Sequence, residues 1–209
     1  DTDRSRGLGD VYKRQNLERY KMQPYPKHTR IHFLYLGRIM KEKGIDELFY
    51  AVRHLKKENE NFVLDLVGFF EDEYKEQVKE LEKHSIAHFY GFQSDPRPFY
   101  IEADCVVLPS YHEGMSNVLL EAAATGRPVI TSNIPGCRES VENGKSGLLV
   151  EVKNKEMLYD AMKEMLHCSR EEREQMGQAG REKMEKEFRK EVVVEKTVQS
   201  LREDEKRDF

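Results

Sequence analysis

Two carboxylates flank a predicted helix start near the middle of the chain. Glu113 and Glu121 are eight residues apart, and Gly114 lies between them. Ser116 or Asn117 is placed to cap the helix that follows, and the free amides at a helix start bind anions. A carboxylate accepts two hydroxyl groups of a sugar or ribose at once, through charged hydrogen bonds of about 1.5–3 kcal/mol each. The segment therefore suits a ligand that has both hydroxyl groups and an anionic group.

Two cations lie on either side of a loop that opens an earlier predicted helix. Arg38 and Lys43 are five residues apart and follow a short apolar run that ends at Gly37. Arginine offers a planar fork of donors and lysine a mobile point charge, and beside a helix N-terminus they suit a diphosphate. The alternatives without a ligand are solvated surface cations and, for Glu121, a partly exposed helix acid.

Short apolar runs that alternate with amphipathic segments must position these side chains. The sequence predicts strands at 31–36, 62–67, 87–90, 104–108, 128–131 and 147–152. It predicts helices at 45–55, 74–81, 96–102, 118–124 and 157–166. This alternation, with glycine at several strand ends, indicates an α/β fold with a parallel sheet of about six strands and helices on both faces. Ligands bind such sheets at the carboxyl ends of the strands, where both segments lie.

The ends of the chain differ in composition from the part between them. The first residues are polar, and their stretch GLGDVYKRQ resembles adapter-derived read-through, so we expect a non-native leader. We expect charged helices after Ser169, with Glu174 near Arg170, and a modest apolar face at 192–201. The predicted division is a leader at 1–15, a proline-bearing linker at 16–30, the α/β domain at 31–168 and a charged helical segment at 169–209.

Composition excludes several classes of protein. The chain has 209 residues, of which 38% are hydrophobic and 35% charged, and this is typical of a charge-rich globular domain. The formal net charge of −4 gives no general attraction to nucleic acid. No apolar run approaches the roughly 18 residues that a membrane helix needs.

The cysteines and histidines predict neither a disulfide framework nor a metal site. The three cysteines form no C-x-x-C pair, so we expect neutral thiols in a reducing compartment: Cys105, Cys137 and Cys168. The seven histidines are scattered, and His112 has no second ligand at metal spacing. The sequence has no secretory signal, which favours the cytoplasm.

Three motifs together resemble a known family. They are G-R-x4-K-G at 37–44, YGF at 90–92, and the long stretch ADCVVLPSYHEGMSNVLLEAAATGRPVITSNIPGCRE from 103 onward, which holds the specific E-x7-E element. From about 16 to 166 the chain resembles the donor-binding half of a family 4, GT-B-type retaining glycosyltransferase. The sequence of these motifs further resembles that of bacterial enzymes that add galactose-type or N-acetylated hexoses to polysaccharide or lipid-linked oligosaccharide precursors.

The resemblance implies a role for each candidate residue. Arg38 and Lys43 would neutralise the donor diphosphate, Glu113 would hold hydroxyls of the transferred sugar, and Glu121 would hold the ribose. Backbone amides near Asn117 and Val118 would hold the distal phosphate. Phe92, at the end of the strand that finishes with YGF, would lie beside the nucleobase, which is expected to be uracil. The implied catalytic residues are Arg38, Lys43 and Glu113. The implied donor-binding set is Gly37, Arg38, Lys43, Phe92, Glu113, Gly114, Met115, Ser116, Asn117, Val118 and Glu121.

The resemblance also implies the rest of the enzyme. We expect no metal and no other cofactor, with a UDP-hexose as substrate and a front-face reaction through an oxocarbenium-like state. A first, acceptor-binding domain of roughly 170 residues would precede this one. The chain would then be a fragment without turnover, whose partners are the UDP-sugar, a glycan or lipid-linked acceptor and the missing N-terminal domain. With a lipid-linked acceptor the enzyme would lie at the inner face of the cytoplasmic membrane.

Two other functions fit the same motifs. One is a GT-B nucleotide-sugar 2-epimerase, and the other is a non-catalytic nucleotide-binding module that kept the fold. A receiver-type phosphorylation domain fits less well, because no acidic cluster follows the first predicted strand.

Overall fold

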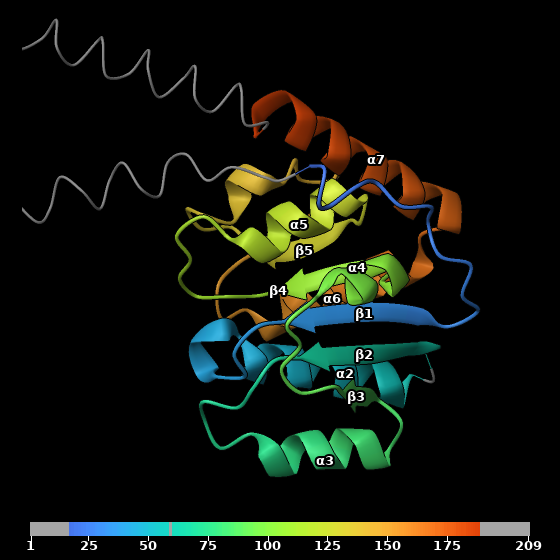
Figure 1. Cartoon of the computed structure of the whole chain (residues 1–209). Helices are drawn as coiled ribbons and strands as arrows, with labels where there is room; N and C mark the ends of the chain where they lie inside the picture. The colour runs from blue at the N-terminus through green and yellow to red at the C-terminus, as the bar shows by residue number, and fades with distance from the viewer. Residues whose placement is uncertain (1–16, 59, 189–209) are drawn as a thin grey trace, which may run out of the picture.

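A parallel sheet forms the centre of the protein (Figure 1). The computed structural model describes residues 17–58 and 60–188. The sheet has six strands in the order β3-β2-β1-β4-β5-β6, which confirms the predicted Rossmann-like α/β fold. The strands are β1 (Ile31–Leu36), β2 (Phe62–Val67), β3 (Ala87–Phe89), β4 (Cys105–Leu108), β5 (Val129–Ser132) and β6 (Gly147–Val150). β3 and β6 end slightly earlier than the expected 87–90 and 147–152.

The strand order reverses beside β1, which pairs in parallel with β2 on one side and β4 on the other. Such a reversal is a topological switch point, where the loops after two neighbouring strands separate and leave a crevice. The loop after β1 carries Arg38 and Lys43, and the loop after β4 carries Glu113. The sheet topology therefore brings the two predicted segments to one edge.

Helices cover both faces of the sheet (Figure 1). α2 (Ile45–Lys57) packs against α6 (Lys155–His167) on one face, and α4 (Arg97–Glu102) and α5 (Asn117–Thr125) lie on the other. α7 (Arg170–Glu187) packs on α5, and α3 (Lys75–Lys83) precedes the edge strand β3 and packs beside it. Within the described residues, each helix is too short or too polar to cross a membrane.

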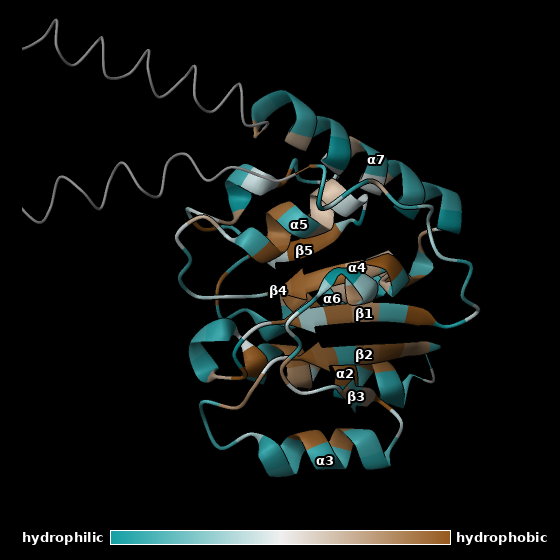
Figure 2. Cartoon of the chain, in the orientation of Figure 1, coloured by the Kyte–Doolittle hydropathy of each residue, from teal (hydrophilic) through white to brown (hydrophobic). Residues whose placement is uncertain are grey.

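The core lies between the sheet and the apolar faces of the helices. β2 is buried along its whole length, as expected for a strand covered on both faces. In α2 the predicted face of Ile45, Leu48, Phe49, Val52 and Leu55 is fully buried. Figure 2 shows this arrangement as apolar strands at the centre and hydrophilic outer surfaces on the helices.

The charged segment after the domain begins as a helix, as predicted. α7 starts with a capping box between Ser169 and Glu172, and Arg170 pairs with Glu174 at 3.3 Å. A Cβ at Gly177 would lie 2.1 Å from the carbonyl oxygen of Gly126, so glycine allows α7 to pack against the end of α5. The apolar face at 192–201 and the leader at 1–15 lie outside the described residues.

The segment that precedes β1 packs along the domain. Its interpretation as a linker stays a prediction, but Tyr20 and Tyr25 are buried. The fully buried Arg127 donates to five carbonyl oxygens, two on this segment, two at the end of α4 and one on the preceding residue, which belong to Gln23, Pro24, Tyr100, Ile101 and Gly126. Arg181 donates to the carbonyl of Tyr20 at 2.9 Å. Guanidinium groups therefore fasten the segment through its backbone.

Candidate functional site

Lys43 and Glu113 meet at the switch point of the sheet. The Lys43 Nζ lies 2.6 Å from the Glu113 Oε1, and the two side chains are only 17% and 15% exposed. The Ser110 hydroxyl donates to the same Glu113 oxygen at 2.8 Å. The structure thus brings together two of the three residues that we expect to be catalytic.

Gly44 allows the start of α2 to reach the loop after β4. It has a φ of +72°, and a Cβ there would lie 2.1 Å from the carbonyl oxygen of Pro109. Tyr111 ties the same two loops together, because its backbone N–H donates to the Glu42 carbonyl at 2.8 Å and its hydroxyl donates to Glu47 at 2.8 Å. Lys43 therefore projects from a turn whose position relative to β4 is fixed by backbone contacts.

The loop that carries Glu113 rests on the loop after β5. Gly136 has a φ of +85°, and a Cβ there would lie 1.3 Å from the carbonyl oxygen of Gly114. The Ser116 N–H donates to the Gly136 carbonyl at 3.0 Å. The Met115 side chain is buried in the core, so only its backbone is available to a ligand.

The start of α5 differs in one detail from the expectation. Ser116 occupies the N-cap position, but its side chain makes no capping bond, and Asn117 is already the first helical residue. The predicted side-chain cap by Ser116 or Asn117 is therefore wrong. The first backbone N–H groups of a helix have no partner within it, so the amides of Asn117 and Val118 suit the anion site we expect there.

Arg38 lies at the same edge of the sheet but pairs elsewhere. Its guanidinium lies 2.8 Å from Glu71, and both side chains are about half exposed. The loops after β1 and β2 touch here, since a Cβ at Gly68 would lie 1.8 Å from the Gly37 carbonyl oxygen. Sequence reasoning missed Glu71. An exposed ion pair of this kind contributes about 0–1 kcal/mol to stability, so Arg38 can exchange Glu71 for a phosphate with little loss of free energy.

Phe92 is an exposed aromatic residue beyond β3. Its side chain is 71% exposed, and Phe69, which follows β2, is 45% exposed. The two rings lie edge to face with centroids 6.4 Å apart. Sequence reasoning missed Phe69, although its place after Gly68 at a strand end was a usable signal. Two apolar rings are thus available at the carboxyl edge of the sheet.

Glu121 lies one turn into α5 and is partly buried. The Tyr100 hydroxyl donates to its Oε2 at 3.0 Å, and the Tyr20 hydroxyl lies beside the same carboxylate. Burial raises the pKa of Glu121, while the two phenol groups act against that rise. Burial and the neighbouring Glu121 charge raise the pKa of Tyr20 to about 12. Neither tyrosine was identified from the sequence.

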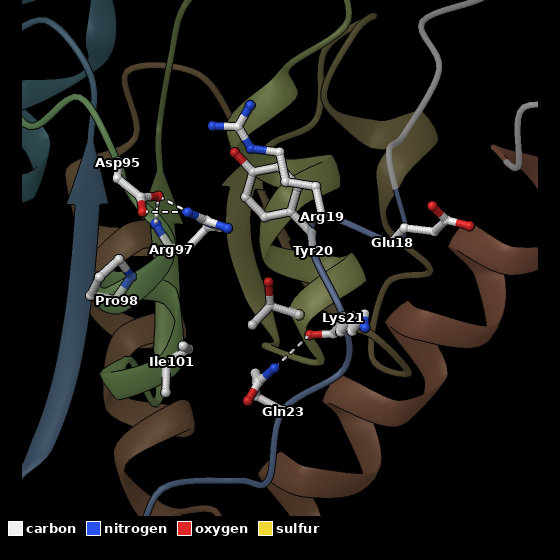
Figure 3. Close-up of a pocket in the computed structure, with 10 residues that line it drawn as sticks. Glu18, Arg19, Tyr20, Lys21, Gln23, Asp95, Arg97, Pro98 and Ile101 are labelled. Carbon is white, nitrogen blue, oxygen red and sulfur yellow. Dashed lines mark hydrogen bonds and ion pairs between the residues drawn. The ribbon is translucent and has the colours of Figure 1, made fainter.

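A pocket of about 440 Å³ lies between α4 and the segment before β1 (Figure 3). At its rim Arg97 pairs with Asp95 at 2.6 Å, which lowers the pKa of Asp95 to about 2. Tyr20 forms part of its wall, and so does Thr125, one turn beyond Glu121 on α5. The pocket therefore adjoins the Glu121 side of the site rather than the pair of Lys43 and Glu113.

The cysteines are not part of this site. Cys105 and Cys137 are buried, Cys168 is half-buried, and all three are free. Burial raises the pKa of each thiol, so all three are neutral, as predicted. Among the residues that the structure describes, no three His, Cys, Asp or Glu side chains are grouped to hold a metal ion. The expectation that the reaction needs no metal stays a prediction.

The sheet order and the polar edge at its switch point define a Rossmann-like ligand-binding domain. A model of the family described as glycosyl transferases group 1 matches residues 18–183. The chain belongs to this family.

Relatives of known name and structure agree with this assignment. The chain is 29% identical over 193 residues to the capsular polysaccharide biosynthesis glycosyltransferase CapM of Staphylococcus aureus, covering 90% of this chain and 50% of CapM. Sucrose-phosphate synthase from Thermosynechococcus elongatus matches with a TM-score of 0.72 and 26% identity, covering 94% of this chain and 50% of that one. Anabaena HepE in complex with UDP matches with a TM-score of 0.77 and 18% identity, covering 92% and 57%. The chain thus spans about half the length of each of these three proteins.

Proposed function

We propose that this chain is the donor-binding half of a retaining glycosyltransferase, which moves a hexose from a UDP-sugar to a polysaccharide or lipid-linked glycan acceptor. The observation that carries the proposal is the ion pair of Lys43 and Glu113 at the switch point. Lys43 lies just before the start of α2, and Glu113 lies just before the start of α5. Support comes from the name of CapM, a polysaccharide biosynthesis glycosyltransferase. The choice of uridine is supported by the motif resemblance and by HepE, a protein of the same fold that was solved with UDP.

The positive groups at the sheet edge stabilise the leaving nucleotide in this proposal. When the bond between the anomeric carbon and the phosphate oxygen breaks, the electron pair goes to the diphosphate. Lys43, Arg38 and the first amides of α5 offset the charge that develops there. Fixed donors of this kind act without reorganising during the reaction, and the contacts of Gly44 and Gly136 are what fix Lys43 and the α5 start.

Glu113 acts as a hydrogen-bond partner of the transferred sugar in this proposal, and not as a nucleophile. Its Oε1 is already occupied by Lys43 and Ser110, which reduces its ability to attack a carbon atom. The acceptor hydroxyl therefore attacks the oxocarbenium-like centre on the face that the diphosphate leaves, so the configuration is retained. Its proton passes to the departing phosphate oxygen, which has gained the electron pair of the broken bond. The acceptor itself binds to the N-terminal half of the enzyme, so this chain alone has no turnover.

Calorimetric titration of the 209-residue chain with UDP, GDP and ADP tests the donor site. We expect preferential UDP binding that the Glu121→Ala variant weakens by about ten- to a hundred-fold, since it loses a charged ribose contact. Glu76→Ala is the matched control, because Glu76 is an exposed helix acid paired only with Lys79 among the contacts described. Equal UDP binding by Glu121→Ala and the wild type would contradict the site. Epimerised sugar released by the complete enzyme would favour the 2-epimerase instead.

A further inference from the structure

Two tyrosines from separate parts of the chain hold the Glu121 carboxylate. Tyr100 comes from α4, is fully buried and donates to the Glu121 Oε2 at 3.0 Å. Tyr20 comes from the segment before β1 and is 7% exposed, and its hydroxyl lies beside the same carboxylate, whose charge raises the pKa of Tyr20. Their rings pack edge to face with centroids 6.0 Å apart. Each ring therefore limits the movement of the other as well as that of Glu121.

We propose that Tyr100 and Tyr20 are positioning residues, which orient the Glu121 carboxylate so that its remaining acceptor sites face the cis-diol of a ribose. This inference rests on the proposed function. An ionised carboxylate offers about four acceptor sites. The Tyr100 hydroxyl uses one of these sites and the Tyr20 hydroxyl lies beside the same carboxylate, so at least two sites remain for the adjacent hydroxyls of a ribose.

Backbone anchors fix both tyrosines in place. Arg127 donates to the carbonyls of Tyr100 and Ile101, each at 2.9 Å, and so holds the end of α4. Arg181 donates to the Tyr20 carbonyl at 2.9 Å and also to the Ala124 carbonyl on α5. Since the Tyr100 hydroxyl is bonded to Glu121, the Tyr20 ring packs on Tyr100 and both backbones are held by arginines, the carboxylate is ordered before a ligand arrives. Preorganisation of this kind improves affinity by lowering the entropy lost on binding.

The contact of Tyr20 makes the geometry of Glu121 depend on the segment before β1. In Figure 3 Tyr20 lies beside Arg19 on the wall of the pocket that faces α4. If this segment left the domain, Glu121 would lose the neighbouring Tyr20 hydroxyl, and Tyr100 would lose the ring that packs on it. In the complete enzyme that we propose, the same segment leads to the upstream half, so the ribose contact is sensitive to the connection between the halves.

The first test follows the pKa of Glu121 by carbon-13 NMR of the free chain. Hydrogen bonds to the ionised form lower the pKa of a carboxyl group, so we expect the Glu121 pKa to rise in Tyr100→Phe and in Tyr20→Phe. Tyr74→Phe is the matched control, since Tyr74 is as buried as Tyr20 and its hydroxyl donates to Asp46 at 2.9 Å on the other side of the sheet. This titration needs no nucleotide. An unchanged Glu121 pKa in both test variants would overturn the inference.

The second test compares the binding of UDP and 2′-deoxy-UDP to the same chain. The wild type should bind UDP more tightly, and Tyr100→Phe should reduce the ratio of the two affinities by about three- to tenfold, the value of one hydrogen bond. Binding of 2′-deoxy-UDP should change little. If Tyr100 had a merely structural role, Tyr100→Phe would lower the affinities for UDP and 2′-deoxy-UDP by the same factor, and that result would overturn the inference. Tyr20→Phe provides the same comparison if Tyr100→Phe does not fold.

The two proposals fail in different ways. If the wild type binds no nucleoside diphosphate while the Glu121 pKa rises in the variants, the donor-site proposal is wrong and the ordering of the carboxylate is supported. If UDP binds and depends on Glu121, but Tyr100→Phe keeps the wild-type ratio, the positioning inference alone is wrong.

Discussion

Lys43 and Glu113 stand 70 positions apart in the sequence and share a 2.6 Å ion pair at the point where the sheet reverses its strand order. Both side chains are mostly buried, so the pair keeps two charges of opposite sign close together where little water screens them. In the function that we propose, a bound donor contacts both charges at once, its phosphates the lysine and its sugar hydroxyls the glutamate. The two roles that we propose are therefore parts of one unit.

Removal of either charge should impair the complete enzyme strongly. We expect Lys43→Ala and Glu113→Ala each to lower turnover by about 10²–10³-fold, because each loses a preorganised electrostatic contact. The double variant should lose much less than the product of the single effects, since residues in direct contact are not additive. Sugar transfer by the full-length enzyme measures all three. Lys79→Ala, an exposed helix cation, is the control, and near-wild-type rates in both single variants would refute the assignment.

Gly44 should be sensitive to the smallest substitution. Gly44→Ala places a side chain in the left-handed region and 2.1 Å from the Pro109 carbonyl, so we expect a loss of at least about 2 kcal/mol in the free energy of unfolding. Gly144→Ala is the matched control, because Gly144 has a similar φ of +75° and no atom within 4 Å of an added Cβ. Gly144→Ala should lower the free energy of unfolding by only about 1 kcal/mol. Urea unfolding compares the two, and equal losses would show that the Pro109 contact contributes nothing.

The sequence predicted the sheet and the edge that carries the pair, because hydrophobic period and glycine-ended runs are local features. It placed Lys43 and Glu113 after the first and fourth predicted strands, and the observed strand order makes those two strands neighbours. It did not reveal Glu71 as the partner of Arg38, nor Tyr20 and Tyr100 as partners of Glu121. Those contacts depend on how side chains from distant elements pack, and no local pattern encodes that. The Ser116 cap failed for a related reason, since a cap residue type does not fix its rotamer.

Arg127 should be among the residues most important for stability. The sequence suggests only the stop of a helix at this point, yet the guanidinium is fully buried and donates to carbonyls on two segments. We expect Arg127→Met to lower the free energy of unfolding by about 3 kcal/mol or more, because it leaves several buried carbonyls without donors. Arg53→Met is the control, since Arg53 forms a surface pair with Glu80. A loss below about 1 kcal/mol would mean that water replaces the guanidinium easily.

His32 gives the stability of the domain a pH dependence. Its ring lies 2.8 Å from Asp65, and this hydrogen bond raises the pKa of His32 above its ordinary 6.5, with a smaller contribution from Asp104, while burial and Arg30 oppose the rise. The ring of His28 packs on it at 4.4 Å. Because the folded pKa is the higher one, the stabilisation is fully present below the unfolded pKa and is lost as the pH rises through the folded value.

Unfolding in urea at about pH 5.5 and about pH 8.5 measures this effect. The wild type should exceed His32→Asn in unfolding free energy by more at the lower pH than at the higher, since the protonated ring gains more from Asp65 than the neutral ring does. The same comparison in an Asp65→Asn background is the control, because the acceptor charge is then absent and most of the pH-dependent difference should disappear. A difference that persists unchanged in that background would assign the effect to another partner of His32, and a difference that grows with pH would reverse the sign of the interaction.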